Sequence, residues 1–490
     1  MSPDPVDTAA PADAKSPVSD EPSLRRQVVR GSMHTIGFYG MTHVLRLAGN
    51  VACAHFLAPA HFAVMSVCFV VLEGIELFSD IGIRPAIVHS PLGHDPDFLN
   101  TAWTIQVVRG VVLWLIACAL GPAVAQIYPE YPEAAGLLPV IGFAAVLSGL
   151  WSTKLHTALK SMRPIQVLVS QLAGQVAAVT CMVIVASIYQ SVWALVIGGL
   201  ISPFVQVLFS HLLLPGVRNR LHWNADHARA LFRYGRWVFL STVFTFLARQ
   251  TDRLVLAGLI GKTMFGVYNQ ALMGARICID VVGQLVDWVA FPAYARIVNS
   301  GDSVQQPFRR MNNLVQLGAG ALVAALIAGG PGLVRVLFDW RYHDAGWMLR
   351  LLAMGGWFAV LESGCSSLHK ALASTRWMAA GHSTKVATMV IALPLGYHLD
   401  GLEGALVGGI CADITRYIVC AIGLERRGFP IFRHDMLTTA AVVATASLGV
   451  YIDSHMFELP PFVRMASSGA AAACLWLVPL GMAAAHYRRK

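Results

Sequence analysis

Charged and polar side chains interrupt several long apolar segments of this chain, and their spacing places them on single helix faces. Tyr39, Thr42, Arg46 and Asn50 follow one another at i, i+3, i+7 and i+11, so they share one face of a helix. A charged group at the centre of an apolar helix costs about 3 kcal/mol in a bilayer and usually faces a cavity or a partner. This face is a candidate binding surface, and its guanidinium group suits phosphate oxygens, which it binds in bidentate fashion.

A stripe of the same kind lies 203 residues later. Thr242, Thr245 and Arg249 repeat the spacing, and Asp252 and Arg253 follow them. The two stripes are candidate walls of one cavity.

Carboxylates form two further stripes. Glu73 and Glu76 lie about one turn apart in one apolar segment, and Asp280 and Asp287 lie about two turns apart in another. Acids at membrane depth are typical of residues that exchange a proton or bind another cation. We predict that one of these two pairs forms a cation site.

A purely structural role is the alternative for each of these charges, since buried charges in membrane helices often pair with one another. The possible pairs are Arg46 with Glu73 or Glu76, the acids of the two stripes with Arg276 or Arg109, Asp252 with Arg253, and Asp413 with Arg416.

The composition indicates that the apolar segments cross a membrane. Of the 490 residues, 56% are hydrophobic and 13% are charged, whereas soluble domains carry about 25% charged residues. About 20 apolar residues span a bilayer. We therefore expect an all-α integral membrane protein with about fourteen transmembrane helices. The expected spans are 31–54, 61–83, 99–125, 135–153, 165–188, 191–214, 234–257, 268–292, 312–334, 347–369, 378–396, 402–423, 436–452 and 463–485.

Basic residues are distributed unevenly between the loops of this map. With the N-terminus in the cytoplasm, roughly 23 Lys and Arg lie in inside segments, and only Lys262, Arg335 and Arg341 lie in outside loops. The positive-inside rule predicts this asymmetry, so we expect both termini to be cytoplasmic. Membrane topology then accounts for the formal net charge of +9, and we expect no nucleic-acid partner.

An internal repeat divides the expected helices into two lobes. A shift of 203 residues superposes the first span on the seventh and Arg46 on Arg249. Six spans separate the copies, so the repeat is parallel, as in transporters whose substrate site lies between two halves. The expected organisation is a disordered cytoplasmic tail (1–23), an N-terminal six-helix lobe (24–214), a cytoplasmic linker (215–233), a C-terminal six-helix lobe (234–430), and two additional helices with a basic cytoplasmic tail (431–490).

Motifs of several enzyme classes are absent from the sequence. It contains no G-x-S-x-G, H-E-x-x-H or H-R-D pattern, and its nine cysteines show no metal-ligand spacing. We expect a protein that is not an enzyme and that uses no metal and no cofactor.

Several motifs resemble those of a known transporter family. They are Tyr234–Thr242, Gln250–Leu254 with Gly266–Tyr268, Leu77–Ile83 with Leu99–Ala102, and Phe291–Ala293. In order and spacing, residues 24–430 resemble the Wzx-type polysaccharide flippases of the MOP exporter superfamily. Arg249 departs from the pattern, because many relatives of that family are expected to carry a small polar residue such as Asn there.

The resemblance implies a flippase of the bacterial inner membrane. Its substrate would be an oligosaccharide joined through diphosphate to undecaprenol, moved to the outer leaflet for exopolysaccharide or lipopolysaccharide assembly. Membrane lipid, a polysaccharide polymerase and chain-length or export proteins would be its partners. The alternatives are another MOP-type exporter, for a peptidoglycan lipid precursor or for drugs, and a membrane polymerase or ligase. A cationic drug would favour acidic cavity side chains, and an enzyme would need longer external loops.

With such a substrate, the arginine stripes would hold the diphosphate. Parallel pseudo-symmetry would place Arg46 and Arg249 on opposite walls of one cavity. We predict that they form a diphosphate clamp, with Arg253 in place of Arg249 if the seventh helix is rotated. The rest of the polar cavity face would consist of Tyr39, Thr42, Asn50, Thr242, Thr245 and Asp252, and the coupling cation would bind Glu73 and Glu76 or Asp280 and Asp287.

Overall fold

The chain folds into long helices, and the described part of it contains no strand, which confirms the all-α prediction. The structure is a computed structural model that describes residues 21–79, 92–160 and 164–455, with a few residues within 82–90 and 460–472. Its main helices are α1 (Glu21–Phe56), α2 (Pro59–Phe78), α4 (Pro96–Ile127), α5 (Ala134–Gly149), α6 (Lys154–Lys160), α7 (Pro164–Tyr189), α8 (Trp193–Leu212), α9 (Ala225–Leu259), α10 (Lys262–Leu285), α11 (Phe291–Asn299), α12 (Gln305–Leu337), α13 (Ala345–Ala371), α14 (Thr375–Glu425) and α15 (Phe432–His455).

Eight of the described helices are long and apolar enough to cross a membrane, namely α2, α4, α7, α8, α12, α13, α14 and α15. The multi-pass membrane prediction is therefore confirmed. The helices α1, α9 and α10 coincide with predicted spans but carry the charged stripes, and α5 is an apolar helix of 16 residues. Most of the last expected span, 463–485, lies outside the described residues, so the count of fourteen stays a prediction.

One long helix corresponds to two of the predicted spans. Helix α14 has 51 residues, but its backbone is not helical at Asp400 (φ −145°, ψ 32°) and Gly401 (φ 57°, ψ −141°). This break falls between the expected spans 378–396 and 402–423. The dihedral angles of Gly401 lie in a region that only glycine adopts without strain.

Several helix ends differ from the predicted bounds. Helix α1 begins at Glu21, inside the expected tail, and α2 ends at Phe78 rather than at residue 83. Helix α9 begins at Ala225, inside the expected linker, because the Asn224 side chain caps it by accepting hydrogen bonds from the N–H groups of the next turn. The expected span 268–292 is divided by a π-helical turn, Val286–Ala290, between α10 and α11. Hydropathy locates apolar segments and does not register such caps and turns.

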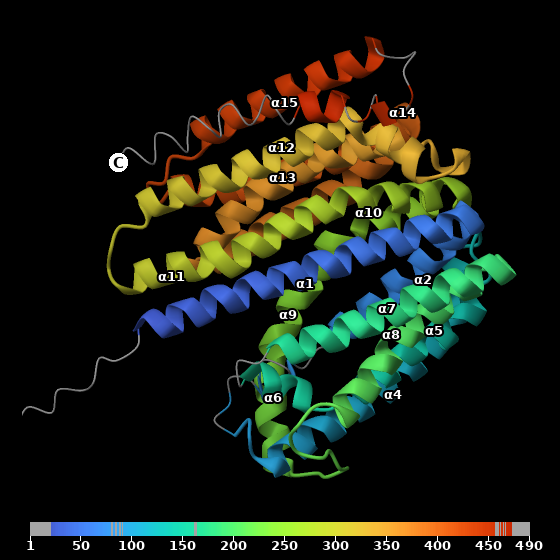
Figure 1. Ribbon diagram of the computed structural model, residues 1–490, viewed down its shortest axis with the longest axis vertical. Helices are drawn as coiled ribbons and strands as arrows, with labels where there is room; N and C mark the ends of the chain where they lie inside the picture. Colours follow the sequence, from blue (N-terminus) through green and yellow to red (C-terminus); the bar gives the residue numbers. More distant parts are fainter. Residues whose placement is uncertain are drawn as a thin grey trace, which may run out of the picture.

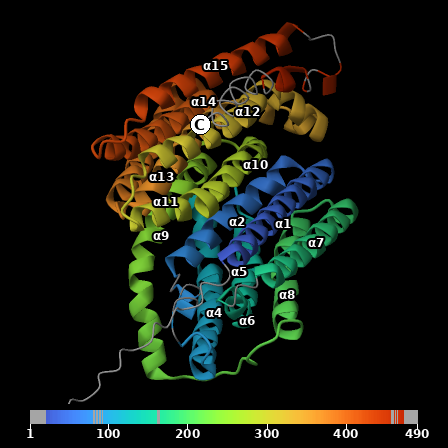
Figure 2. The same cartoon turned by 60° about the vertical axis from the view of Figure 1, so that its left-hand side comes forward.

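The helices form two groups with the same internal contacts, which we call the N lobe (α1–α8) and the C lobe (α9–α14). Helix α1 packs on α7 as α9 packs on α14, and α4 packs on α5 as α12 packs on α13. Helix α1 ends at Phe56 and α9 at Leu259, 203 residues later. Figures 1 and 2 show the two groups, with α15 lying outside the C lobe along α12.

The two lobes meet at residues that the repeat makes equivalent. The Ser66 hydroxyl on α2 donates a hydrogen bond to the Asn269 side-chain oxygen on α10 at 2.7 Å, and the two residues are 203 positions apart. Residues related by a pseudo-two-fold axis touch each other only close to that axis. The Ser66–Asn269 contact therefore marks the pseudo-axis between the lobes.

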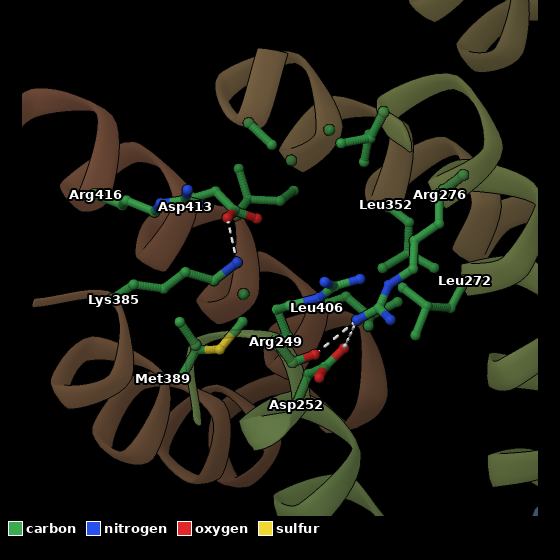
Figure 3. Close-up of a pocket in the computed structure, with 18 of the residues that line it drawn as sticks. Arg249, Asp252, Leu272, Arg276, Leu352, Lys385, Met389, Leu406, Asp413 and Arg416 are labelled. Carbon is green, nitrogen blue, oxygen red and sulfur yellow. Dashed lines mark hydrogen bonds and ion pairs between the residues drawn. The ribbon is translucent and has the colours of Figure 1, made fainter. Parts of the chain in front are cut away.

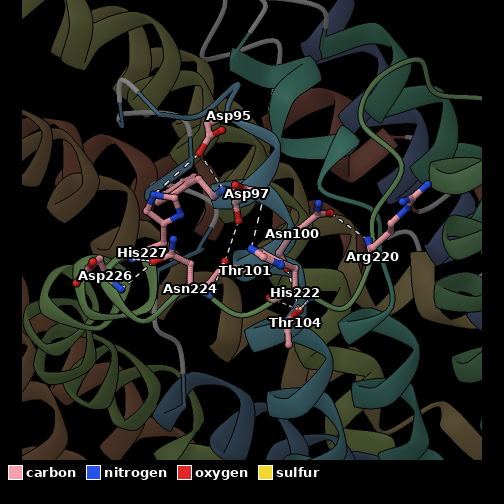
Figure 4. A network of polar contacts seen from close by, with 11 residues as sticks. Asp95, Asp97, Asn100, Thr101, Thr104, Arg220, His222, Asn224, Asp226 and His227 are labelled. Atoms are coloured by element: carbon pink, nitrogen blue, oxygen red, sulfur yellow. Dashed lines mark hydrogen bonds and ion pairs between the residues drawn. The ribbon is translucent and has the colours of Figure 1, made fainter.

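The segment between the lobes is fastened to the N lobe (Figure 4). Its backbone N–H groups bond to side chains at the start of α4, and Asn219 bonds to the Ser152 and Thr153 side chains before α6. The α4 contacts are Arg220 N–H to Asn100, His222 N–H to Thr104 and Asn224 N–H to Thr101. The linker is therefore attached to the N lobe, and α9 is the first element of the C lobe.

At the helix ends predicted to face outside, contacts between the lobes close the structure, and we call them the outer contacts. Tyr128 donates to the Leu254 carbonyl, Lys262 pairs with Glu133 at 2.7 Å, Arg341 donates to the Ala54 and His55 carbonyls, and Tyr342 donates to the Leu57 carbonyl. Partial burial raises the pKa of Glu133, but the hydrogen bond from Lys262 and its charge bring that pKa below the ordinary value.

Candidate functional site

Two pockets lie on either side of helix α9. The larger, which we call the N-lobe pocket, has a volume of about 620 Å³. It lies between α1, α2, α5, α7 and α8 of the N lobe. Helices α9 and α10 of the C lobe form its remaining wall. Its polar lining consists of Arg46, Asn50, Ser66, Glu73, Glu76, Gln175, Ser202, Arg253, Asn269 and Gln270.

The second pocket, the C-lobe pocket, has a volume of about 350 Å³ and lies between α9, α10, α13 and α14. Figure 3 shows acidic and basic side chains around it, with leucines and a methionine between them. Its charged lining consists of Arg249, Asp252, Arg276, Asp280, Lys385, Asp413 and Arg416.

Helix α9 separates the pockets because neighbouring arcs of its surface face different ways. At 100° per residue, Thr245, Arg249 and Asp252 lie within an arc of about 60°, and all three line the C-lobe pocket. Arg253 is turned by a further 40° or so from Arg249 and lines the N-lobe pocket. The boundary between the pockets therefore runs between Arg249 and Arg253.

The predicted geometry of the clamp is not the one that the structure shows. Arg46 lines the N-lobe pocket and Arg249 the C-lobe pocket, so the two arginines do not share a cavity. Arg253, which we considered for a rotated seventh helix, is the side chain from α9 that shares the pocket with Arg46. The repeat relates Arg46 to Arg249 correctly, but the rotation of α9 decides which arginine reaches this pocket.

The arginines of the N-lobe pocket have no acidic partner in the described part of the chain. Neither Arg46 nor Arg253 forms an ion pair there, so the predicted structural pairs of Arg46 are not found. The Glu73 carboxylate accepts instead from the Gln250 side chain, whose oxygen accepts from Arg253 at 3.0 Å. The buried Nε of Arg253 has no hydrogen-bond partner. Both guanidinium groups therefore keep donors for a ligand.

Most basic groups of the C-lobe pocket, in contrast, are paired across helices. Lys385 binds Asp413 at 2.6 Å, and Arg416 binds Glu362, of which only 2% is exposed. The predicted pairing of Asp413 with Arg416 is therefore wrong. Each residue pairs with a side chain on a facing helix, because the packing of α13 and the two halves of α14 brings those partners closer.

Asp252 is likewise engaged by α10 and not by its neighbour Arg253. Tyr268 donates its hydroxyl to one Asp252 oxygen at 2.8 Å, and Arg276 lies 3.9 Å from the same oxygen. Arg276 also donates to the Arg249 carbonyl at 2.7 Å. The predicted Asp252–Arg253 pair is wrong because α9 directs these two side chains to different pockets.

The structure separates the four acids proposed for a cation site. Glu73 and Glu76 line the N-lobe pocket, and Asp280 lines the C-lobe pocket. Asp287 lies in the π-helical turn and pairs with Lys370 at 2.7 Å, outside both pockets. The predicted partnership of Asp280 with Asp287 is not seen. Among the described residues, no three His, Cys, Asp or Glu side chains gather as metal ligands.

The remaining polar-face residues are divided in the same way. Asn50 lines the N-lobe pocket and Thr245 the C-lobe pocket. Thr42 bonds to the Phe38 carbonyl of its own helix at 2.9 Å and lines neither pocket. The side chains of Tyr39 and Thr242 lie outside the described part of the structure.

Sequence reasoning missed two polar bridges, Gln250–Glu73 and Ser66–Asn269, which join α2 to α9 and to α10. Ser66 and Asn269 are related by the 203-residue shift and could have been found from the repeat. No sequence signal identifies Gln250 as a partner of Glu73.

Comparisons with known proteins agree with this architecture. The lipopolysaccharide biosynthesis protein WzxC of Escherichia coli is 21% identical over 399 residues, which cover 81% of this chain and 80% of WzxC. The succinoglycan biosynthesis transport protein ExoT of Rhizobium meliloti is 21% identical over 350 residues, covering 69% and 67% of the two chains. Among solved structures, the lipid II flippase MurJ in an inward closed conformation shares the fold, with a TM-score of 0.74 at 12% identity over 92% of this chain and 98% of MurJ.

The family of polysaccharide biosynthesis proteins matches residues 52–347. This region includes most of the N lobe and the first helices of the C lobe, and therefore the α9 and α10 walls of both pockets, but neither Arg46 nor the α13–α14 wall of the C-lobe pocket. The chain belongs to the polysaccharide biosynthesis protein family, as its resemblance to Wzx-type flippases predicted.

Proposed function

We propose that this protein flips oligosaccharide units linked to undecaprenyl diphosphate across a bacterial inner membrane, for exopolysaccharide or lipopolysaccharide assembly. The observation that carries the proposal is the N-lobe pocket, where Arg46 and Arg253 share a cavity of about 620 Å³ without an acidic partner among the described residues. The names of WzxC and ExoT place such relatives in polysaccharide biosynthesis and transport. The likeness to MurJ concerns the fold and does not identify the transported substrate.

In this proposal the diphosphate lies between Arg46 and Arg253. Both guanidinium groups stay charged at physiological pH and bind phosphate oxygens in bidentate fashion. Each charge-assisted hydrogen bond contributes about 1.5–3 kcal/mol. Asn50 and Gln270 line the same pocket and offer neutral donors beside the arginines. Two arginines bind firmly enough to select the diphosphate and weakly enough to release it.

The direction of transport follows from alternating access between the lobes. The outer contacts close one end, so the substrate enters from the inner leaflet and leaves when these contacts break. Cytoplasmic placement of both termini, and a polymerase with chain-length or export proteins as partners, belong to this proposal.

The test is flipping of labelled lipid-linked oligosaccharide in liposomes that contain the purified protein. Added periodate reports the fraction of glycan that reaches the outer face. We expect flipping by the native chain, and a loss of at least about tenfold in Arg46→Gln and Arg253→Gln, the equivalent of one charge-assisted hydrogen bond. Arg309→Gln, an exposed arginine at the start of α12 that lines neither pocket, is the matched control. Equal glycan exposure with and without the native protein would reject the proposed function.

A further inference from the structure

The C-lobe pocket differs chemically from the N-lobe pocket, and we propose that it binds the sugar part of the substrate whose diphosphate lies in the N-lobe pocket. This inference rests on the proposed function and divides one substrate between two subsites. Three features of the pocket carry it, namely its charge balance, its unpaired polar atoms, and its position on α9.

Ion pairing leaves fewer basic groups of the C-lobe pocket free to bind a diphosphate. Two of its basic side chains, Lys385 and Arg416, are neutralised by ion pairs with Asp413 and Glu362. Asp280 adds an acid that has no ion partner among the described residues. Glu73 and Glu76 likewise line the N-lobe pocket, so the two pockets differ in how their basic groups are paired and not in the presence of acids. The C-lobe pocket therefore favours a ligand with little charge and many polar groups.

Unpaired donors and acceptors line this pocket. Asp252 is only 8% exposed, and its Oδ1 is buried without a hydrogen-bond partner. Arg249 and Asp280 form no side-chain hydrogen bond or ion pair in the described part of the chain. A hydroxyl group both donates and accepts, so neighbouring sugar hydroxyls match a guanidinium beside carboxylates. Filling the unpaired position at Asp252 also removes the cost of a buried acceptor without a partner.

The size and walls of the pocket fit a short saccharide. Its volume of about 350 Å³ lies at the lower end of small-molecule sites, which range over about 300–1,000 Å³. Leu272, Leu352, Met389 and Leu406 provide apolar surface between the charged groups (Figure 3). The C–H faces of sugar rings pack against such surface while their hydroxyls reach the polar groups.

The two pockets meet at consecutive residues of α9. Asp252 and Arg253 are consecutive residues, yet Asp252 lines the C-lobe pocket and Arg253 the N-lobe pocket. In a lipid-linked oligosaccharide the first sugar is bonded directly to the diphosphate. A diphosphate at Arg253 and a sugar at Asp252 would therefore contact consecutive residues of α9.

Binding measurements on the purified full chain in detergent test the division. Farnesyl diphosphate probes the diphosphate subsite by calorimetry. The delipidated oligosaccharide, released by mild acid from the lipid-linked intermediates of the producing cells, probes the sugar subsite by saturation-transfer NMR. We expect Asp280→Asn and Asp252→Asn each to weaken oligosaccharide binding by about tenfold, the equivalent of one hydrogen bond, with less than about twofold effect on farnesyl diphosphate. Arg46→Gln should weaken the binding of farnesyl diphosphate by about tenfold and change the binding of the oligosaccharide by less than about twofold.

The outcomes separate this inference from the proposed function. If farnesyl diphosphate binds through Arg46 but Asp280→Asn and Asp252→Asn bind the oligosaccharide as the native chain does, the sugar subsite is wrong and the function stands. If neither probe binds the native chain, both proposals fail. Among the described residues Asp280 has no side-chain partner to lose, so Asp280→Asn keeps the test valid even if Asp252→Asn, which loses charge beside Arg276, fails to fold.

Discussion

At the scale of single residues, the N-lobe pocket depends on the shape of its cations as well as on their charge. Arg46 and Arg253 reach it from α1 and α9, and neither is paired with an acid among the described residues. A planar guanidinium holds two phosphate oxygens at once, whereas an ammonium group acts as a point charge. A clamp and a structural charge therefore respond differently to lysine.

We expect Arg46→Lys to lose at least about tenfold in flipping although it keeps the charge, because it loses one of two parallel hydrogen bonds. The protein should still accumulate in the membrane, which immunoblotting of membrane fractions checks. The flipping assay in liposomes measures the effect, and Arg309→Lys is the matched control. Native flipping by Arg46→Lys would show that Arg46 only balances charge.

The acids differ in their access to the pockets, and this difference predicts which of them can couple transport to a cation. Glu73 and Glu76 line the N-lobe pocket, whereas Asp287 is held by Lys370 outside it. We expect the Glu73→Gln, Glu76→Gln double variant to abolish the dependence of flipping on a proton or sodium gradient. Asp287→Asn should retain it. The measurement is the flipping rate with and without an imposed gradient, and an unchanged gradient dependence in the double variant would end this proposal.

At the scale of elements, the break within α14 is set by backbone conformation and not by packing. Gly401 has φ 57° and ψ −141°, and a Cβ added there would meet no atom within 4 Å. Any destabilisation by alanine must therefore come from the backbone, where a residue other than glycine in a sparsely populated region costs about 1–3 kcal/mol.

We expect Gly401→Ala to lower the midpoint of thermal unfolding in detergent by several degrees. Gly409→Ala is the matched control, since Gly409 lies in the same helix, has no positive φ and also has no atom within 4 Å of an added Cβ. It should be neutral or slightly stabilising, because alanine has the higher helix propensity. Size-exclusion chromatography after heating measures both. Equal midpoints would mean that the chain bends elsewhere.

Helix α15 is fastened to the C lobe by buried polar contacts at its first turns. The Asp435 carboxylate accepts from Gln316 of α12 and Tyr417 of α14, each at 2.7 Å. Because buried acceptors without partners are costly, these bonds fix the rotation of α15. The first of the two additional helices is thus an integral part of the C-lobe surface.

At the scale of the whole molecule, alternating access requires the outer contacts to break while each lobe stays intact. The contacts come from opposite lobes, as in Lys262 at the start of α10 with Glu133 before α5. The contacts of the linker, as in Asn219 with Thr153, stay within the N lobe. The two kinds of contact therefore predict opposite effects of a cross-link.

We expect a short thiol cross-linker to stop flipping in the Glu133→Cys, Lys262→Cys variant, because it locks the outer end. The Thr153→Cys, Asn219→Cys variant should flip at the native rate after cross-linking. Both variants keep the same native cysteines, so each controls for reaction elsewhere. Flipping rates before and after the reagent, and after its reduction, are the measurement. Continued flipping by the first variant would show that the outer end does not open.

The sequence by itself determined the class of the protein, the order of its helices and its parallel repeat. These properties are one-dimensional. Hydropathy depends on the composition of a short window of sequence. Loop charge depends on the number of Lys and Arg in each loop, and the equivalence of Arg46 with Arg249 depends on a fixed shift of 203 residues. The motifs also predicted the family, which residues 52–347 confirm.

Only the tertiary structure decided which charged groups share a pocket. Arg249 and Arg253 differ by about 40° around α9, and that angle separates the C-lobe pocket from the N-lobe pocket. Periodicity shows which residues share a helix face but not the direction in which packing turns that face. For the same reason, Asp413 binds Lys385 of a facing helix and not its near neighbour Arg416, because ion pairs follow distances between helices, which no spacing along the chain contains.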